Sequence, residues 1–388
     1  MTAIRPDDPT PVSTPQNTLT TPASLTVLQV ITKGEIGGAQ THVRTLCEAL
    51  GQAVTFHAAI GGTEPQPPLD QALRVQGVAV HRVPSLSNSL APWRLYRAVR
   101  ELIVILHAVR PQLLHAHSSA AGVAARIAGY LTRTPVVYTV HGFAFKPGAP
   151  PLRRLLAWVS ECLCAPLTSQ LICVSTHELQ WARRLPLHRD RCSVIPNALE
   201  DTPHRAAPAT TPMNVVMVAR MAPPKRADLL ILALAELRDQ QGQEVPATLV
   251  GDGPDLPLLC TQAQGLGLQQ LRWAGSRSDV PQLLAQHAVF VLLSNHEGMP
   301  ISIIEAMRAG MAIVASDLPG IRELLPTANH GLCVSNQVTA ITAALQQLLQ
   351  NSNIRENLGH TARSQYELAH TPERMALAVL DVYRHIAA

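Results

Sequence analysis

Short apolar runs rich in β-branched residues recur along the chain from residue 24, and longer stretches of helical character separate them. In the first half of the chain these runs occupy residues 24–32, 54–62, 78–84, 113–118, 136–142, 170–175 and 192–197. A regular alternation of short strands with helices favours a parallel sheet that helices cover on both faces. The first half therefore predicts one doubly wound parallel sheet.

A segment rich in Pro, Ala and Thr, residues 201–212, interrupts this pattern before it resumes. The second series of apolar runs occupies residues 214–220, 247–253, 271–275, 289–294, 312–316 and 331–334. Because 388 residues exceed what one hydrophobic core usually serves, two domains are expected. The predicted fold class is α/β, with two Rossmann-like doubly wound parallel-sheet domains that face a central cleft.

The predicted domain boundaries follow these changes in composition. They are a disordered tail at 1–23, an N-terminal domain at 24–200, a linker at 201–212, a C-terminal domain at 213–370 and a last helix at 371–388. The tail is rich in Thr and Pro and carries too little apolar content to fold. Three helical segments follow residue 338, and the last is a candidate to pack back on the N-terminal domain.

Charge and aromatic content exclude nucleic-acid binding. Charged residues make up 15% of the chain, the formal net charge is +4 and aromatic residues make up 3%. A nucleic-acid binder would need more cations and more stacking side chains. The stretches 92–102 and 151–159 combine Arg with Trp and Leu, which fits either a peripheral contact with the inner membrane surface or ordinary helices covering the sheet.

Cysteine usage and hydropathy predict the compartment. The seven cysteines lie between Cys47 and Cys333, mostly inside apolar runs, which indicates buried thiols in a reducing environment. The chain has no run of about 18 uninterrupted apolar residues, the length that a membrane helix needs. Its N-terminus lacks the basic-then-apolar pattern of a secretory signal. A cytoplasmic location is expected, with or without peripheral attachment to the cytoplasmic membrane.

Two glycines follow the first apolar run, at a place where open parallel sheets bind ligands. Gly37 and Gly38 lack side chains, so backbone N–H groups there could approach a phosphate closely. A plain tight turn is the alternative.

Two cations follow the first apolar run of the second series. Arg220 and Lys225 lie in V-A-R-M-A-P-P-K, where a guanidinium and an ammonium can together neutralise a diphosphate. Solvated surface cations are the alternative. Arg226 is expected to be an exposed residue at the start of a helix.

Two carboxylates lie eight positions apart in S-N-H-E-G-M-P-I-S-I-I-E, after the apolar run 289–294. Pro300 suits the first helical position, which places Glu297 in a loop and Glu305 inside a helix. The helix N-terminus suits a phosphate, and the two carboxylates can accept sugar hydroxyls nearby. Two solvated surface acids are the alternative.

Three histidines, His115, His117 and His141, stand at the ends of predicted strands. No carboxylate or cysteine pattern completes a metal site around them, so no metal is expected. His115 and His117 are expected to be structural. His141 fits either a cleft residue that hydrogen-bonds a sugar hydroxyl or a half-buried structural histidine.

Taken in order, the motifs V-A-R-M-A-P-P-K, L-V-G-D-G-P and H-E-G-M-P-I-S-I-I-E-A-M resemble those of family 4 retaining glycosyltransferases, the group 1 enzymes of the GT-B fold. The motifs G-G-A-Q-T-H-V, T-V-H-G-F, I-C-V-S and V-I-P-N add softer similarity in the N-terminal domain. The resemblance spans nearly everything after the tail. It implies that the N-terminal domain binds the acceptor and the C-terminal domain binds the nucleotide-sugar donor.

The resemblance implies roles for individual residues. Arg220 and Lys225 would hold the donor diphosphate, Glu305 the ribose and Glu297 the donor sugar; backbone groups of Gly298, Met299 and Ile301 would contact sugar and phosphate; Gly37 and Gly38 would lie near the diphosphate and His141 near the C6 hydroxyl of the sugar. The expected catalytic set is His141, Glu297, Arg220 and Lys225.

The chain departs from the family pattern at three glycine positions. Ala219 and Arg226 stand where the family usually has glycines around the basic motif. Ala198 replaces the glycine after V-I-P-N, so either a stiffer hinge or a left-handed Asn197 is expected.

The resemblance predicts retaining transfer of a hexose or N-acetylhexosamine from a nucleotide sugar, expected to be a UDP-sugar, to a glycan or lipid-linked acceptor in polysaccharide or glycoconjugate biosynthesis. It suggests front-face substitution, in which the leaving phosphate accepts the acceptor's proton. No D-x-D motif occurs, so neither a metal nor another cofactor is expected. The alternatives are a GT-B-like UDP-sugar 2-epimerase and a non-catalytic nucleotide-sugar-binding partner subunit.

Overall fold

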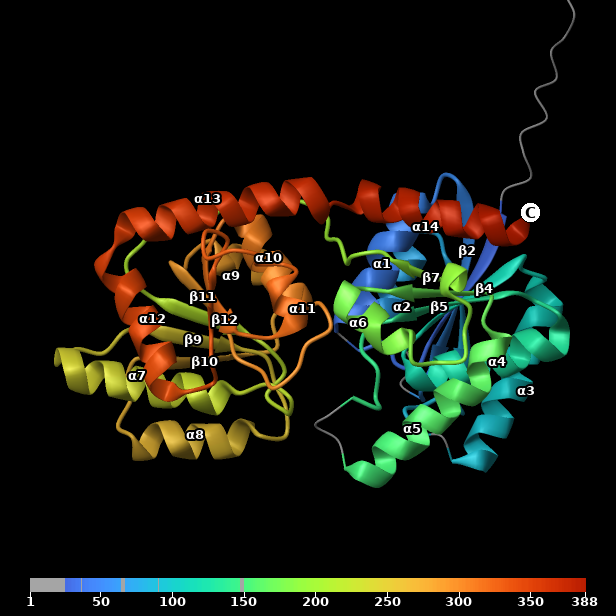
Figure 1. Cartoon of the computed structure of the whole chain (residues 1–388), viewed down its shortest axis with the longest axis horizontal. Helices are drawn as coiled ribbons and strands as arrows, with labels where there is room; N and C mark the ends of the chain where they lie inside the picture. Colours follow the sequence, from blue (N-terminus) through green and yellow to red (C-terminus); the bar gives the residue numbers. More distant parts are fainter. Residues whose placement is uncertain (1–24, 36, 64–66, 90, 147–149) are drawn as a thin grey trace, which may run out of the picture.

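Two α/β domains lie side by side in the computed structural model, which describes residues 25–35, 37–63, 67–89, 91–146 and 150–388 (Figure 1). The tail predicted at 1–23 lies outside the described residues. Each domain is built on one parallel sheet with helices on both faces, as predicted.

The first sheet has seven strands in the order β3-β2-β1-β4-β5-β6-β7, and every neighbouring pair is parallel. The strands are β1 Leu25–Ile31, β2 Val54–Gly61, β3 Ala79–Val83, β4 Leu113–His117, β5 Val136–Val140, β6 Gln170–Cys173 and β7 Cys192–Val194. Every residue of β4 and β5 is buried, because helices cover both faces at the centre of the sheet. The strand order reverses between β1 and β4, where such sheets bind ligands.

The second sheet has six parallel strands in the order β10-β9-β8-β11-β12-β13. The strands are β8 Val215–Val218, β9 Ala247–Val250, β10 Leu271–Gly275, β11 Val289–Leu292, β12 Ala312–Ser316 and β13 Leu332–Val334. Its order reverses between β8 and β11. The loop after β8 carries the basic motif, and the loop and helix after β11 carry the pair of glutamates, so the fold brings the two motifs to one point of the sheet.

Helices cover both sheets. In the first domain they are α1 Gly38–Leu50, α2 Pro68–Val75, α3 Pro92–Val109, α4 Ser119–Thr132, α5 Pro151–Cys164 and α6 Thr176–Ala182, with the 3-10 turns η1 Ala165–Leu167 and η2 Arg189–Arg191. The second series is α7 Ala227–Gln241, α8 Leu256–Gly265, α9 Val280–Leu284, α10 Ile301–Ala309, α11 Pro319–Arg322, α12 Val338–Gln350, α13 Ser352–Ala369 and α14 Pro372–Ala387.

Two local predictions differ from the structure. Helix α10 begins at Ile301, and Pro300 is its N-cap, because the ψ of Pro300 is 121° and therefore extended. Asn197 is absent from the non-glycine residues with positive φ in the described chain, so the left-handed alternative for the hinge is wrong. Its side chain instead donates to the Met299 carbonyl at 3.1 Å and accepts from His42 Nδ1 at 3.1 Å. These bonds hold the turn after Pro196 without a left-handed residue.

The chain crosses between the domains at two neighbouring places. The segment after β7 leads to the second domain, where Asp201 pairs with Arg363 and the Pro208 carbonyl accepts from Arg355. The return crossing lies between α13 and α14, and it is tied to the first crossing by a backbone bond from Leu199 N to His370 O of 3.1 Å.

Helix α14 completes the first domain (Figure 1). Its residues Met375, Val379 and Tyr383 are buried in the same hydrophobic cluster as Val27 and Leu46. It packs on α1, whereas α13 lies over the second domain.

Candidate functional site

The loop after β8 folds across the carboxyl end of β11. Lys225 forms an isolated antiparallel bridge with Ser294, and the Asn295 N–H donates to the Pro224 carbonyl at 2.9 Å. This pairing brings Lys225 Nζ to 2.5 Å from Glu297 Oε1, with the two side chains only 18% and 11% exposed. The predicted cation and the predicted acid therefore form one ion pair, although they are far apart in the sequence.

Arg220 lies in the same loop, and its exposed side chain makes no hydrogen bond or ion pair with a described residue. The loop itself is held rigidly, because the Met221 N–H donates to the Asp252 carbonyl at 2.9 Å. Gly251 makes this possible: its φ is 127°, and a Cβ there would lie 1.9 Å from the Ala219 carbonyl oxygen. The L-V-G-D-G-P motif thus supports the loop that carries Arg220.

The loop of Glu297 reaches the first domain at Gly298. A Cβ at Gly298 would lie 2.4 Å from the His141 carbonyl oxygen, so the two backbones are in direct contact. Gly38, at the start of α1, approaches α10 similarly, since a Cβ there would lie 3.2 Å from Ile301 Cγ1. Four predicted site residues therefore meet in pairs across the junction of the two domains.

Two more predicted residues belong to this junction. Met299 is buried, and both its carbonyl oxygen and its Sδ accept from Asn197, so its carbonyl is engaged by the hinge. Gly37 precedes α1 with extended backbone, and its carbonyl accepts from the Thr41 N–H at 2.9 Å.

Glu305 lies on α10, as predicted, and is partly buried. Its carboxylate makes no hydrogen bond to a described residue. Burial raises the pKa of Glu305 to about 6, and the nearby Arg308 guanidinium opposes that rise. Arg226 is the N-cap of α7 and pairs with Asp228 rather than with Glu297; it is half-buried, not exposed as expected.

Four histidines gather behind the junction. His141 Nε2 lies 3.3 Å from His117 Nδ1, and the ring of His42 packs edge-on against His141 with centroids 5.0 Å apart. His115 and His117 are fully buried and hydrogen-bonded, in agreement with the structural interpretation. Burial lowers the pKa of His42 to about 4, and it lowers the pKa of His141 well below its usual range. The cluster is therefore neutral near pH 7.

Sequence reasoning missed a buried ion pair next to His141. Lys146 pairs with Glu178, and both side chains are buried. Glu178 also accepts from the Phe143 N–H at 3.3 Å and approaches Gly298, where a Cβ would lie 3.3 Å from Glu178 Oε1. The only sequence signal is S-T-H-E at the start of α6, a capping pattern that indicates a local structural role.

A second missed contact joins the domains directly. The Glu323 carboxylate, after α11, accepts from the Thr176 and His177 N–H groups at 2.6 and 2.7 Å. It thereby satisfies the first N–H groups of α6 and joins the second domain to the first.

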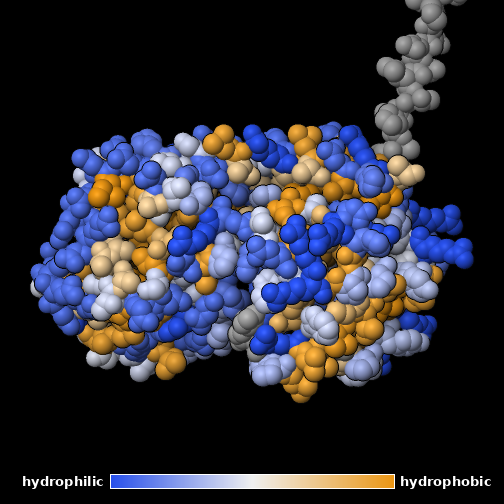
Figure 2. Space-filling model, in the orientation of Figure 1, coloured by the Kyte–Doolittle hydropathy of each residue, from blue (hydrophilic) through white to orange (hydrophobic). Residues whose placement is uncertain are grey.

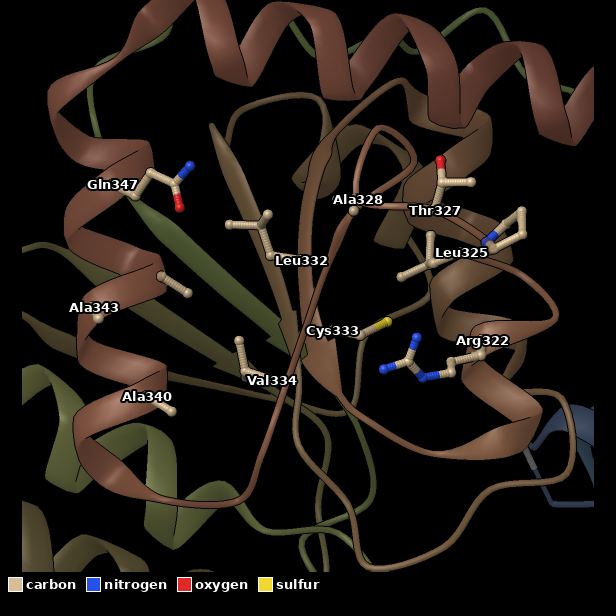
Figure 3. A pocket seen from close by; sticks show the side chains of 13 residues that line it. Arg322, Leu325, Thr327, Ala328, Leu332, Cys333, Val334, Ala340, Ala343 and Gln347 are labelled. Carbon is tan, nitrogen blue, oxygen red and sulfur yellow. The ribbon is translucent and has the colours of Figure 1, made fainter.

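A hollow of about 430 Å³ opens elsewhere on the second domain, between β13, α11 and α12 (Figure 3). Arg322, Cys333 and Gln347 are among its lining residues, and none of the predicted site residues lines it. Among the residues that the structure describes, no three His, Cys, Asp or Glu side chains converge to hold a metal ion. In the same part of the chain, no helix is long and apolar enough to cross a membrane.

Comparison with known protein families covers both domains. The family model for Glycosyltransferase Family 4 matches residues 36–202, and the model for Glycosyl transferases group 1 matches residues 200–365. The chain is a glycosyltransferase of group 1, family 4. The family resemblance and the enzyme class predicted from the motifs are therefore confirmed.

Curated relatives of this glycosyltransferase carry names of the same enzyme class. The UDP-Gal:alpha-D-GlcNAc-diphosphoundecaprenol alpha-1,3-galactosyltransferase of Escherichia coli is 29% identical over 285 residues, which are 68% of this chain and 73% of the relative. The putative glycosyltransferase EpsD of Bacillus subtilis is 26% identical over 350 residues, which are 84% of this chain and 88% of EpsD.

Solved structures support the GT-B fold of the glycosyltransferase. HepE of Anabaena in complex with UDP and glucose has a TM-score of 0.79 at 20% identity, covering 92% of this chain and 99% of HepE. The sucrose-phosphate synthase of Thermosynechococcus elongatus has a TM-score of 0.77 at 18% identity, covering 93% of this chain and 99% of that chain. The predicted arrangement of two Rossmann-like domains is confirmed.

Proposed function

We propose that this glycosyltransferase moves a hexose or N-acetylhexosamine from a UDP-sugar to a lipid-linked glycan, with retention at the anomeric carbon. The observation that carries the proposal is the contact between Gly298 and the His141 backbone, which places the Lys225–Glu297 pair beside His141. The E. coli relative is named for a UDP-galactose donor and a diphosphoundecaprenol acceptor, and HepE was solved with UDP and glucose.

In this proposal each side of the junction has its own task. Lys225 and the exposed Arg220 neutralise the diphosphate as it leaves, and such preorganised charge is commonly the largest contribution to catalysis. Glu297 and His141 hold hydroxyls of the donor sugar. The acceptor oxygen bonds to the anomeric carbon while the bond from that carbon to the diphosphate breaks, and the acceptor's proton passes to a phosphate oxygen. The closed junction limits access of water to the donor.

A donor screen tests the proposal. A UDP-sugar should raise the melting temperature of the protein by mass action, and UDP should be released only when a glycan-diphosphate lipid is added. An isomerised donor without acceptor would instead identify an epimerase. Absence of binding by every nucleotide sugar would refute the proposal.

Glu305 gives a prediction with a defined pH dependence. Its folded pKa of about 6 lies above the ordinary value of 4.5, so folding favours its neutral form, and the contribution of that form to stability is lost as the pH rises through 6. Glu305→Gln should therefore raise the free energy of unfolding of the ligand-free protein at pH 7.5, by on the order of 1–2 kcal/mol. At pH 4.5 it should change that free energy little.

The same variant should bind UDP more weakly at pH 7.5, because an amide cannot accept ribose hydroxyls as a carboxylate does. Wild-type affinity for UDP should rise between pH 5 and pH 7 as Glu305 ionises, and the variant should lose that rise. Calorimetry at both pH values, combined with thermal denaturation, measures the two effects. Equal affinity of both proteins at pH 7.5 would contradict the role given to Glu305.

We also propose that the first domain contacts an anionic membrane surface, where a lipid-linked acceptor resides. The apolar side chains Leu152, Leu155, Leu156 and Leu163 of α5 are 55–72% exposed. Trp93 of α3 is 56% exposed, with the Arg94 and Arg97 guanidinium groups over its ring. Figure 2 shows apolar side chains gathered on the lower right, over α5 and α3. Aromatic, aliphatic and arginine side chains on one face fit the headgroup region of an anionic bilayer.

Vesicle sedimentation tests this contact. Leu155→Glu combined with Leu156→Glu should lower binding to vesicles that contain anionic phospholipid by about tenfold or more. The reason is that burial of each leucine side chain in the bilayer contributes a free energy on the order of 1.5 kcal/mol. Leu258→Glu, on the equally exposed α8 of the second domain, is the matched control and should bind like wild type. Binding that is unchanged in the double variant would rule out α5 as the contact.

A further inference from the structure

A line of buried polar side chains connects α14 to His141. The Gln29 Nε2 group donates to the Tyr383 hydroxyl at 3.1 Å, and Gln29 Oε1 lies 2.8 Å from His117 Nε2. His117 Nδ1 then lies 3.3 Å from His141 Nε2. Gln29, His117 and Tyr383 are completely buried, whereas His141 is partly accessible at the domain junction.

The chemistry of these groups fixes where each proton lies. Because Gln29 Oε1 can only accept, His117 Nε2 carries the proton. Burial keeps His117 neutral, so its Nδ1 is an acceptor and receives the proton of His141 Nε2. His141 Nδ1 is left with a lone pair, and it makes no hydrogen bond to a described residue.

The Tyr383 hydroxyl, at the α14 end of this line of hydrogen bonds, fixes which group donates in each bond. It lies 2.6 Å from His115 Nδ1, and His115 Nε2 lies 2.7 Å from Thr139 Oγ1. By donating to His115, the hydroxyl keeps its lone pair for the Gln29 amide N–H. His115 and Thr139 therefore form a side branch, and the path to His141 runs through Gln29 and His117 alone.

The other groups that face His141 do not supply an alternative proton path. His42 is buried beside it, but its Nδ1 bonds to Asn197 and its Nε2 has no partner among the described residues. The Glu178 carboxylate bonds to Lys146 and to the Phe143 N–H. The hydrogen bond to His117 is therefore the contact that orients the His141 ring.

We propose that Gln29, His117 and Tyr383 are positioning residues that hold His141 in the Nε2-protonated tautomer, with its Nδ1 lone pair presented to a hydroxyl of the donor sugar. The inference rests on the proposed function for the identity of that hydroxyl. Its consequence is that the packing of α14 on the first domain determines the tautomer of His141 at the domain junction.

Two variants of the full-length protein test the path. Gln29→Met keeps the volume but cannot hydrogen-bond, and Tyr383→Phe removes only the hydroxyl. Thr168→Val is the matched control, because it breaks a similarly buried hydrogen bond of the first domain, from Thr168 Oγ1 to the Cys164 carbonyl, that touches none of these residues. Imidazole nitrogen NMR of histidine-labelled protein, assigned with His141→Gln, reads the tautomer directly.

Wild type and Thr168→Val should show His141 Nδ1 unprotonated, and Gln29→Met and Tyr383→Phe should show a mixture of tautomers. The latter two should lose about tenfold in kcat with a donor KM within about threefold, whereas Thr168→Val should keep its kcat even where its melting temperature falls. An unchanged tautomer in Gln29→Met and Tyr383→Phe would overturn the inference, and so would an equal kcat loss in Thr168→Val. Because the tautomer is read without substrate, failure of the donor screen would refute the proposed function and leave this test intact.

Discussion

Lys225→Ala is expected to lower kcat/KM for the sugar donor by about 10²- to 10³-fold. The ammonium is largely enclosed, and its residue is bridged to Ser294 at the end of the loop between β8 and α7, so it needs little rearrangement to meet the charge that develops on a leaving diphosphate. Its removal also leaves the Glu297 carboxylate without its partner, and that uncompensated negative charge opposes donor binding. Steady-state kinetics with the preferred donor measures the loss.

Arg238→Ala is the control for this experiment. Arg238 also forms an ion pair, with Asp239, but at the far end of α7. It should retain nearly full activity. If Lys225→Ala kept more than about a tenth of wild-type kcat/KM, neutralisation by Lys225 would not be the main source of catalysis.

Gly298→Ala is expected to separate the two halves of the site. The new methyl would lie 2.4 Å from the His141 carbonyl oxygen, and neither backbone can yield without moving a domain. A displacement of about 1 Å at reacting groups costs on the order of 10²-fold in rate, so a loss of that size in kcat is expected. The variant should still bind UDP, because Arg220 and Lys225 belong to the second domain.

Gly265→Ala supplies the comparison, since a Cβ there meets nothing within 4 Å. It should behave as wild type in both assays. Full activity in Gly298→Ala would mean that the contact with His141 is not needed for turnover.

The strands were predictable because helices cover both faces of each sheet. Both sides of a strand are then buried, and its sequence is a continuous apolar run. Each apolar run in the sequence contains a strand. Most of the strands end before their runs do, as at Val140 and Val250, because the following residues already form the loops at the sheet edge. The predicted start of α10 was one residue too early, because the preference of proline for a helix N-terminus does not distinguish the N-cap from the first helical residue.

The sequence motifs predicted individual residues of the site, but not how these residues pair or what they contact at the domain junction. Lys225 and Glu297 were assigned separately, and only the fold reveals that they pair. Lys146, Glu178 and Glu323 left no usable signal, because their partners come from elements far away in the sequence. A left-handed backbone at Asn197 was one of the two alternatives expected for the hinge, and Asn197 acts through its side chain instead. Long-range polar contacts of this kind depend on the packed structure and carry no local pattern.

The seating of α14 has a consequence for how the protein is made. The core around Val27 and Leu46 needs Met375, Val379 and Tyr383, which leave the ribosome only after the whole second domain has been synthesised. Until then the first sheet exposes an apolar face that this helix will cover. The domain that is translated first is therefore the domain whose folding finishes last.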